Sequence, residues 1–107
     1  MLYIALIKDK PDVQAKREAL MAEHVAWIQR NRSWLLLAGS MRSDRGATPQ
    51  GGLWIMDVGS KLEAEEKIKE DPFWKNGLRA SADVCYWGMA YPDMEITSAI
   101  FKRSAES

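Results

Sequence analysis

The sequence has one cysteine, no net charge and no long apolar run, and each shortage excludes a class of protein. Cys85 has no second cysteine to pair with, so the chain cannot form an internal disulfide. Fifteen basic residues balance fifteen acidic ones, which argues against a polyanionic partner such as nucleic acid. The apolar run at residues 2–7 is far shorter than the roughly 20 residues of a membrane-spanning helix. Since the first residues show no signal-peptide pattern, we expect a cytoplasmic, one-domain protein with neither a membrane nor a nucleic-acid partner.

Apolar runs and turn signals alternate along the chain in the order strand, helix, strand, strand, helix, strand. The strand patterns lie at residues 2–8, 33–39, 53–58 and 82–91. The first helix is predicted over residues 11–31, with Pro11 in its first turn. Ser60 and Glu63 have capping-box spacing and open the second helix, which ends before Pro72. Residues 41–52 are polar and contain Gly and Pro, which predicts a long hairpin loop.

This order predicts an α+β fold: a ferredoxin-like βαββαβ sandwich with a four-stranded antiparallel sheet and two helices on one face. A sheet covered on one face only should alternate apolar and polar residues. The first strand instead has apolar residues on both faces: Leu2, Ile4 and Leu6 on one, and Tyr3, Ala5 and Ile7 on the other. Because the helices cover one face, a second copy of the sheet is the simplest cover for the other, which predicts a homodimer.

Two basic residues lie in the middle of the apolar stripe of the first helix. Arg17 and His24 are seven residues apart, so at 100° per residue they project within about 20° of each other. A buried Arg without a partner is very costly. For His24 alone, a hydrogen-bonded core histidine is the simpler interpretation. With Arg17 on the same line, the pattern favours a polar pocket between helix and sheet.

Asp71 stands at the predicted end of the second helix, where a carboxylate faces the negative end of the helix dipole. Spacing alone favours a structural role, because Asp-Pro is a common helix stop. Since the two helices run antiparallel, Asp71 lies toward the start of the first helix. Two partners therefore stay open for it, His24 and Arg17.

These features, in this order, resemble the YciI-like family. The resemblance includes Arg17 and His24 on the first helix, "LLLAGS" at 35–40 and "DPFWKNGL" at 71–78. It spans residues 1–91, taken as one domain, and leaves 92–107 as an unplaced C-terminal tail. It implies a ferredoxin-like dimeric α+β barrel whose His–Asp active-site pair would be His24 and Asp71. The family commonly has Pro where Ser40 stands here, and we treat Ser40 as a candidate substrate-binding residue.

Two functional hypotheses use these residues. In the first, the protein is an enzyme with no cofactor and no metal that performs proton transfer or elimination on a small cyclic or aromatic acid. His24 is then the acid/base, Asp71 orients it and Arg17 anchors the anion. In the second, the protein is a non-catalytic dimeric module that binds a small anionic metabolite. A haem- or quinone-handling monooxygenase is a third possibility from fold analogy alone. Cys85 is expected to be a buried apolar residue on a central strand.

Overall fold

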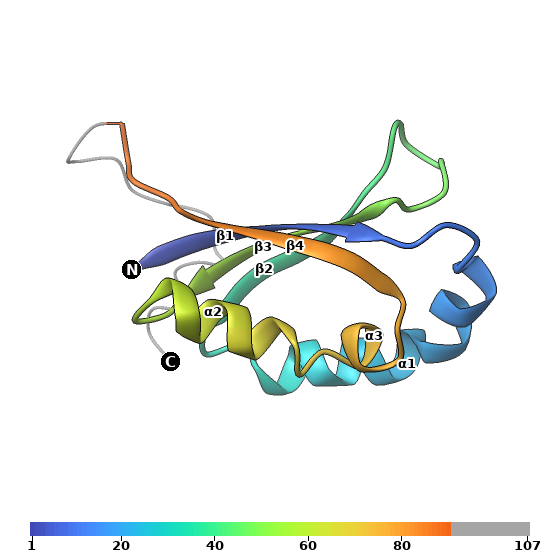
Figure 1. Ribbon diagram of the computed structural model, residues 1–107, viewed down its shortest axis with the longest axis horizontal. Helices are drawn as coiled ribbons and strands as arrows, with labels where there is room; N and C mark the ends of the chain where they lie inside the picture. The colour runs from blue at the N-terminus through green and yellow to red at the C-terminus, as the bar shows by residue number, and fades with distance from the viewer. Residues whose placement is uncertain (91–107) are drawn as a thin grey trace.

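The computed structural model describes residues 1–90, which form a sheet layer and a helix layer (Figure 1). The strands are β1 (Leu2–Asp9), β2 (Leu35–Met41), β3 (Gly51–Asp57) and β4 (Arg79–Tyr86). They pair antiparallel throughout, in the order β2-β3-β1-β4. The helices α1 (Gln14–Arg30), α2 (Lys61–Ile68) and α3 (Pro72–Lys75) lie together on one side of the sheet. The predicted α+β class and the one-sided, four-stranded antiparallel sheet are confirmed.

Several predicted boundaries are wrong, and one element was missed. α1 begins at Gln14 instead of Pro11, because Asp12 has a φ of 57° and breaks the helical backbone before that point. β4 runs over Arg79–Tyr86 instead of 82–91. Pro72 does not end the helical region but begins α3, since its fixed φ suits the first turn of a helix. The predicted domain end at residue 91 and the tail 92–107 lie outside the described residues.

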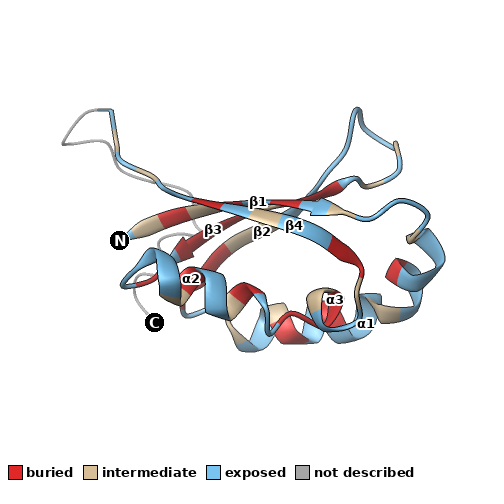
Figure 2. Ribbon diagram, in the orientation of Figure 1, coloured by how far each residue is buried: buried red, intermediate tan, exposed pale blue. Residues whose placement is uncertain are grey.

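The core fills the space between the sheet and the helices (Figure 2). β1 contributes Tyr3, Ala5 and Ile7, and β3 contributes Trp54 and Met56, all of them buried. α2 begins at Ser60, whose side chain accepts a hydrogen bond from the Glu63 N–H as the capping box predicts, and it buries Ala64 and Ile68. The packing of these apolar side chains between the two layers therefore holds in place the strands that border the site described below.

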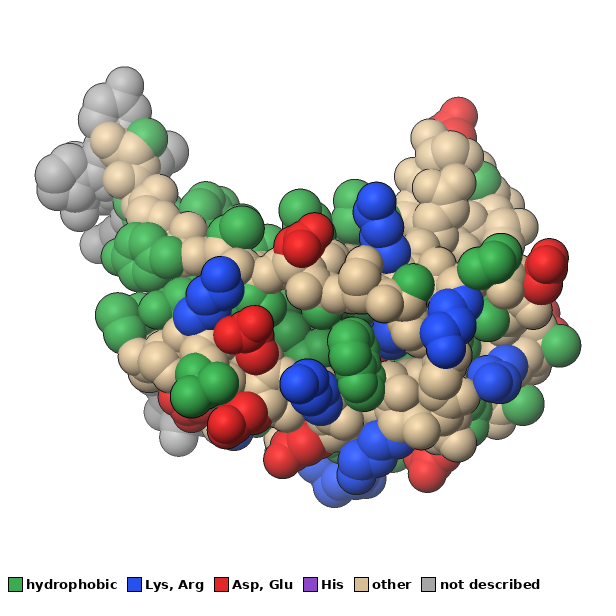
Figure 3. Space-filling view, in the orientation of Figure 1, with side chains coloured by type: hydrophobic (Ala, Val, Ile, Leu, Met, Phe, Trp, Pro, Cys, Tyr) green, Lys and Arg blue, Asp and Glu red, His purple; other side chains and the backbone are tan. Residues whose placement is uncertain are grey.

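The opposite face of the sheet carries apolar side chains that no described helix covers. Leu6 of β1 lies opposite Leu53 of β3, and Ile4 lies opposite Ile55. The two pairs are two residues apart along each strand and therefore share this face. Leu6 is 43% exposed, and Figure 3 shows hydrophobic side chains along this side of the molecule. Cys85 lies on β4, which is an edge strand, and is exposed, so the expectation of a buried cysteine on a central strand is wrong. Within residues 1–90, no helix is long and apolar enough to span a membrane.

Candidate active site

The polar side chains on the inner face of α1 are buried, as their position in the apolar stripe predicts. Arg17 is 5% exposed and His24 7% exposed, and the third buried residue of the helix is Trp27. Met21 and Val25 lie beside them on α1 but are more than a third exposed. The helix therefore buries its two basic residues more deeply than these apolar neighbours, which indicates that specific partners hold the basic groups.

His24 pairs with Asp71. Its Nδ1 lies 2.6 Å from Oδ1 of Asp71, and the Asp71 side chain is almost completely buried. The two residues are 47 positions apart, and α1 meets the chain just before α3 at this point. The residue spacing left two possible partners for Asp71, His24 and Arg17. In the structure Asp71 pairs with His24, and Arg17 pairs with Asp9 instead.

Asp71 is also the N-cap of α3. Its Oδ1 accepts a hydrogen bond of 3.1 Å from the backbone N–H of Phe73. The predicted unfavourable position at a helix C-terminus is therefore wrong, because the chain starts a new helix at Pro72. A carboxylate at an N-cap satisfies a free helical N–H. The cap also holds the carboxylate in place for the imidazole.

The ring of Phe73 orients His24 from the side. The two rings are stacked, with centroids 3.9 Å apart and planes within 10° of parallel. Phe73 is completely buried, so the stacking restricts rotation of the imidazole. With Nδ1 engaged by Asp71, Nε2 is the ring nitrogen without a hydrogen-bond partner among residues 1–90. Nε2 is therefore the atom through which His24 can exchange a proton with a bound molecule.

A second arginine and a second aspartate extend the pair into a buried network. Arg79 Nη2 lies 3.4 Å from Oδ2 of Asp71, and its Nη1 donates a 2.7 Å hydrogen bond to Oδ1 of Asp9. Arg17 Nη1 donates to the other oxygen of Asp9. The charges of these two arginines and two aspartates cancel. Burial lowers the pKa of the Arg17 guanidinium, and the Asp9 carboxylate opposes that effect.

Sequence reasoning missed Asp9 and Arg79, which hold this network together. Asp9 is the last residue of β1, one position beyond the predicted strand, and Arg79 precedes the predicted start of the last strand. The available signal was Gly77, which has a φ of 73° and ends α3. The Leu78 N–H donates back to the Phe73 carbonyl, so β4 begins at the next residue with the Arg79 side chain buried.

A cavity of about 260 Å³ opens beside His24, between α1 and the sheet; we call it the histidine cavity. Its apolar lining consists of Met21, Val25, Ile28, Ala38 and Trp54. Its polar side chains are His24, Arg17, Ser40, Arg42 and Arg79. No carboxylate lines it, because Asp9 and Asp71 lie behind the arginines and the histidine. A cavity lined by both cationic and apolar side chains suits a small, flat, acidic molecule.

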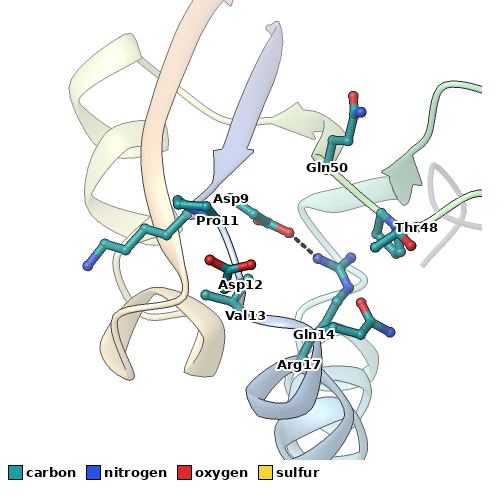
Figure 4. Close-up of a pocket in the computed structure, with 10 residues that line it drawn as sticks. Asp9, Pro11, Asp12, Val13, Gln14, Arg17, Thr48 and Gln50 are labelled. Carbon is teal, nitrogen blue, oxygen red and sulfur yellow. Dashed lines mark hydrogen bonds and ion pairs between the residues drawn. The ribbon is translucent and has the colours of Figure 1, made fainter.

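Arg17 also borders a second cavity of about 420 Å³, between the segment after β1 and the hairpin joining β2 to β3 (Figure 4). The ion pair of Asp9 and Arg17 lies at its wall, and Thr48 and Gln50 border it from the hairpin. Asp9 and Asp12 both line this second cavity, so it is less suited to an anion.

The predicted site residues therefore meet at one place. His24, Arg17 and Ser40 line the histidine cavity, and Asp71 supports His24 from behind. Ser40 is on β2, where its Oγ accepts a 3.0 Å hydrogen bond from Arg42 Nε. Among residues 1–90, no three His, Cys, Asp or Glu side chains gather closely enough to hold a metal ion.

Comparisons with known proteins identify a family and structural neighbours. Residues 1–88 match the model of a family described as the YCII-related domain. The structure resembles 5-chloro-2-hydroxyhydroquinone dehydrochlorinase (TftG) from Burkholderia phenoliruptrix, solved in complex with 2,5-dihydroxybenzoquinone. The TM-score is 0.73 at 27% identity, over 82% of this chain and 94% of that one. Protein Atu4242 from Agrobacterium tumefaciens matches at 20% identity, over 88% of this chain and 100% of that one, with a TM-score of 0.44. No curated protein matches the sequence.

Proposed function

This chain belongs to the YCII-related domain family, and on that premise we propose that it is an enzyme that moves protons on a small hydroxylated aromatic ring. The observation that carries the proposal is the buried His24–Asp71 pair, whose histidine lines a cavity with both cationic and apolar side chains. A dehydrochlorinase of similar structure acts on a hydroxyhydroquinone and binds a dihydroxybenzoquinone, which favours a substrate of this chemical class.

In the proposed reaction, His24 Nε2 accepts the proton of a ring hydroxyl and returns it to the neighbouring ring carbon. The O–H bonding pair becomes part of a C=O bond, and ring π electrons form the new C–H bond, so the product is a keto tautomer. If that carbon carries a leaving group such as chloride, His24 then accepts the proton of a second hydroxyl, para to the new carbonyl. The leaving group departs with its bonding pair, and the products are a quinone and HCl, with no external oxidant.

Each supporting residue has a proposed role in this reaction. The Asp71 carboxylate stabilises the imidazolium that forms after each proton uptake and keeps Nε2 directed at the cavity. Arg17 binds a ring oxygen through the donors that Asp9 does not engage. Ser40 contributes to substrate binding from the opposite wall, on β2. The protein's own residues supply every proton transfer, so the proposal includes no cofactor or metal.

The test is hydrogen–deuterium exchange on the ring carbons of 1,2,4-trihydroxybenzene, followed by proton NMR in deuterated buffer without oxygen. Ketonisation exchanges ring C–H for C–D, so this assay detects the proposed step without a leaving group. We expect the protein to accelerate exchange above the buffer rate. His24→Gln should reduce the acceleration by roughly 100-fold or more, the range for loss of a general acid–base. Asp71→Asn should also slow it.

Binding of 2,5-dihydroxybenzoquinone, measured by calorimetry, is the control for both variants. Equal exchange by the wild type and by a folded His24→Gln variant would remove His24 from the mechanism. Binding without any exchange above buffer would instead favour the second hypothesis, a non-catalytic module for a small anionic metabolite.

We also propose that the protein is a homodimer in which a second copy covers the outer face of the sheet. The supporting observation is the apolar set on that face, with Leu6 and Met41 each more than two-fifths exposed. Burying such side chains is favourable at about 25 cal/mol per Å² of apolar surface, which drives association of matching faces.

A further inference from the structure

The arginines around the histidine cavity differ in how their charges are balanced. Arg17 pairs with Asp9, and Arg79 lies between Asp9 and Asp71. Both guanidinium groups are therefore neutralised by buried carboxylates. With two arginines and two aspartates, this network carries no net charge and adds little positive potential to the cavity.

Arg42 is different, because its described partners are neutral oxygens. Its Nε donates to Ser40 Oγ at 3.0 Å and its Nη1 donates to the carbonyl of Ala47 at 2.7 Å. A guanidinium has five N–H donors, so three of them have no partner among residues 1–90. Arg42 is exposed, just after the end of β2, and lines the same cavity as His24. It is therefore the source of the net positive charge at this cavity when His24 is neutral.

The field of Arg42 also reaches Arg17. The positive charges of Arg79 and Arg42 contribute to lowering the pKa of Arg17, in addition to the larger effect of burial. An anionic group bound in the cavity would reduce this repulsion between like charges. The positive potential in the cavity therefore favours binding of an anion, and Arg42 carries the charge that the anion would neutralise.

We propose that Arg42 is the residue that selects an ionised substrate, by binding an anionic oxygen of the ring, and that Ser40 is a positioning residue for its guanidinium. The inference rests on the proposed use of the histidine cavity and assigns the charge recognition in it. It predicts a preference for rings that carry an ionised oxygen at neutral pH over uncharged rings of the same size. The Ser40–Arg42 hydrogen bond and the bond to Ala47 hold the fork of donors in a fixed orientation, which favours recognition by two hydrogen bonds.

The experiment compares two probes by calorimetry at pH 7. The first is 2,5-dihydroxybenzoquinone, whose hydroxyls are acidic because each is conjugated to a carbonyl. The second is hydroquinone, which stays neutral because phenol hydroxyls ionise at a pH of roughly 10. The variants are Arg42→Gln, Arg42→Lys and Ser40→Ala. The matched control is Arg45→Gln, an exposed arginine of the same hairpin that does not line the histidine cavity.

We expect Arg42→Gln to weaken binding of the anionic probe by about tenfold or more, the usual effect of losing a hydrogen bond to a charged group. Its binding of hydroquinone should not change, and the salt dependence of anion binding should fall. Arg42→Lys keeps the charge but loses the fork, so it should retain part of the affinity. Ser40→Ala should cause a smaller loss than Arg42→Gln, and Arg45→Gln should match the wild type.

Equal affinity of Arg42→Gln and Arg45→Gln for the anionic probe would overturn the inference, as would an equal loss for both probes. Failure of the wild type to bind the anionic probe would overturn it as well, whatever the exchange assay shows. The proposed enzymatic function fails separately. If the wild type gives no ring exchange but binds the anion through Arg42, the enzyme proposal is wrong and the recognition site stands.

Discussion

At the scale of single residues, His24 is held in place by two residues at the beginning of α3, its N-cap Asp71 and Phe73 in its first turn. Asp71 engages Nδ1, and the Phe73 ring stacks on the imidazole. Phe73 also donates its backbone N–H to the same Asp71 oxygen. The guanidinium carbons of Arg17 and Arg79 lie 5.2 and 5.0 Å from the centre of the Phe73 ring, within the range of cation–π attraction. One aromatic residue therefore connects the histidine to the charged network.

Asp9 should matter more for stability than Arg17, although the two form one ion pair. Asp9→Asn leaves both Arg17 and Arg79 buried without their shared carboxylate, and we expect a loss of about 3–5 kcal/mol in the free energy of unfolding. Arg17→Met leaves Asp9 paired with Arg79 and removes a buried Nε that has no partner in the described residues. Its loss should stay below about 2 kcal/mol.

Urea unfolding followed by circular dichroism measures both losses. Asp57→Asn is the control, because Asp57 is exposed and its ion pair with the N-terminus should contribute less than about 1 kcal/mol. Losses of equal size for Asp9→Asn and Arg17→Met would contradict the bridging role of Asp9.

At the scale of elements, the four-residue helix α3 carries more of the site than its length suggests. Such a short helix is not stable by itself, because forming the first turn costs more than its few hydrogen bonds return. Asp71 caps its beginning, and Gly77 ends it with a φ of 73°. Between these two residues lies Phe73, and after them β4 begins at Arg79. The local geometry of α3 therefore sets the positions of three site residues.

Gly77→Ala tests this role of α3. An Ala Cβ at a left-handed φ costs roughly 1–2 kcal/mol, so we expect a stability loss of that size. Because the strain lies between Phe73 and Arg79, binding of 2,5-dihydroxybenzoquinone should weaken as well. Ser60→Ala is the matched control, since losing the N-cap of α2 costs about 1 kcal/mol but α2 does not line the cavity. If both variants bind the probe equally well, α3 does not set the geometry of the site.

At the scale of the whole molecule, the two faces of the sheet differ in what covers them. The inner face packs against the helices and carries the site, whereas the outer face presents apolar side chains of β1, β2 and β3. The hairpin between β2 and β3 rises on that outer side (Figures 1 and 3). The same hairpin contains Arg42, so an assembly over the outer face would lie close to the segment that we propose selects the substrate.

The dimer is tested by light scattering at micromolar protein concentration. The wild type should have twice the chain mass of 12.1 kDa. Leu53→Lys places a charge on the outer face and should shift the protein toward the monomer, because a charge buried without a partner is costly. Leu62→Lys is the control, since Leu62 is 64% exposed on α2, on the helix side. A monomeric wild type would overturn the dimer, and equal masses for the two variants would place the interface elsewhere.

The sequence alone determined the order of the main elements, the one-sided sheet and the family, because these depend on periodicity and local signals. It also placed Arg17 and His24 on one buried face of α1, since the 3.6-residue repeat fixes which side chains share a face. The capping box at Ser60 and Glu63 was readable for the same reason. These properties arise between residues a few positions apart.

The spacing of the residues did not decide which side chains pair, although the family resemblance implied His24 with Asp71; the tertiary structure decided it. Asp71 pairs with His24 across 47 positions, and Arg79 pairs with Asp9 across 70. A local sequence pattern cannot predict contacts at such large separations in the chain. The start of α3 at Pro72 depends in part on Asp71 and Phe73 being held against α1, which a helix-stop signal cannot convey. The balance of charge at the cavity follows from these pairings: buried carboxylates neutralise Arg17 and Arg79, and Arg42 keeps its charge. Electrostatic pairing depends on distance in space, and the fold sets that distance.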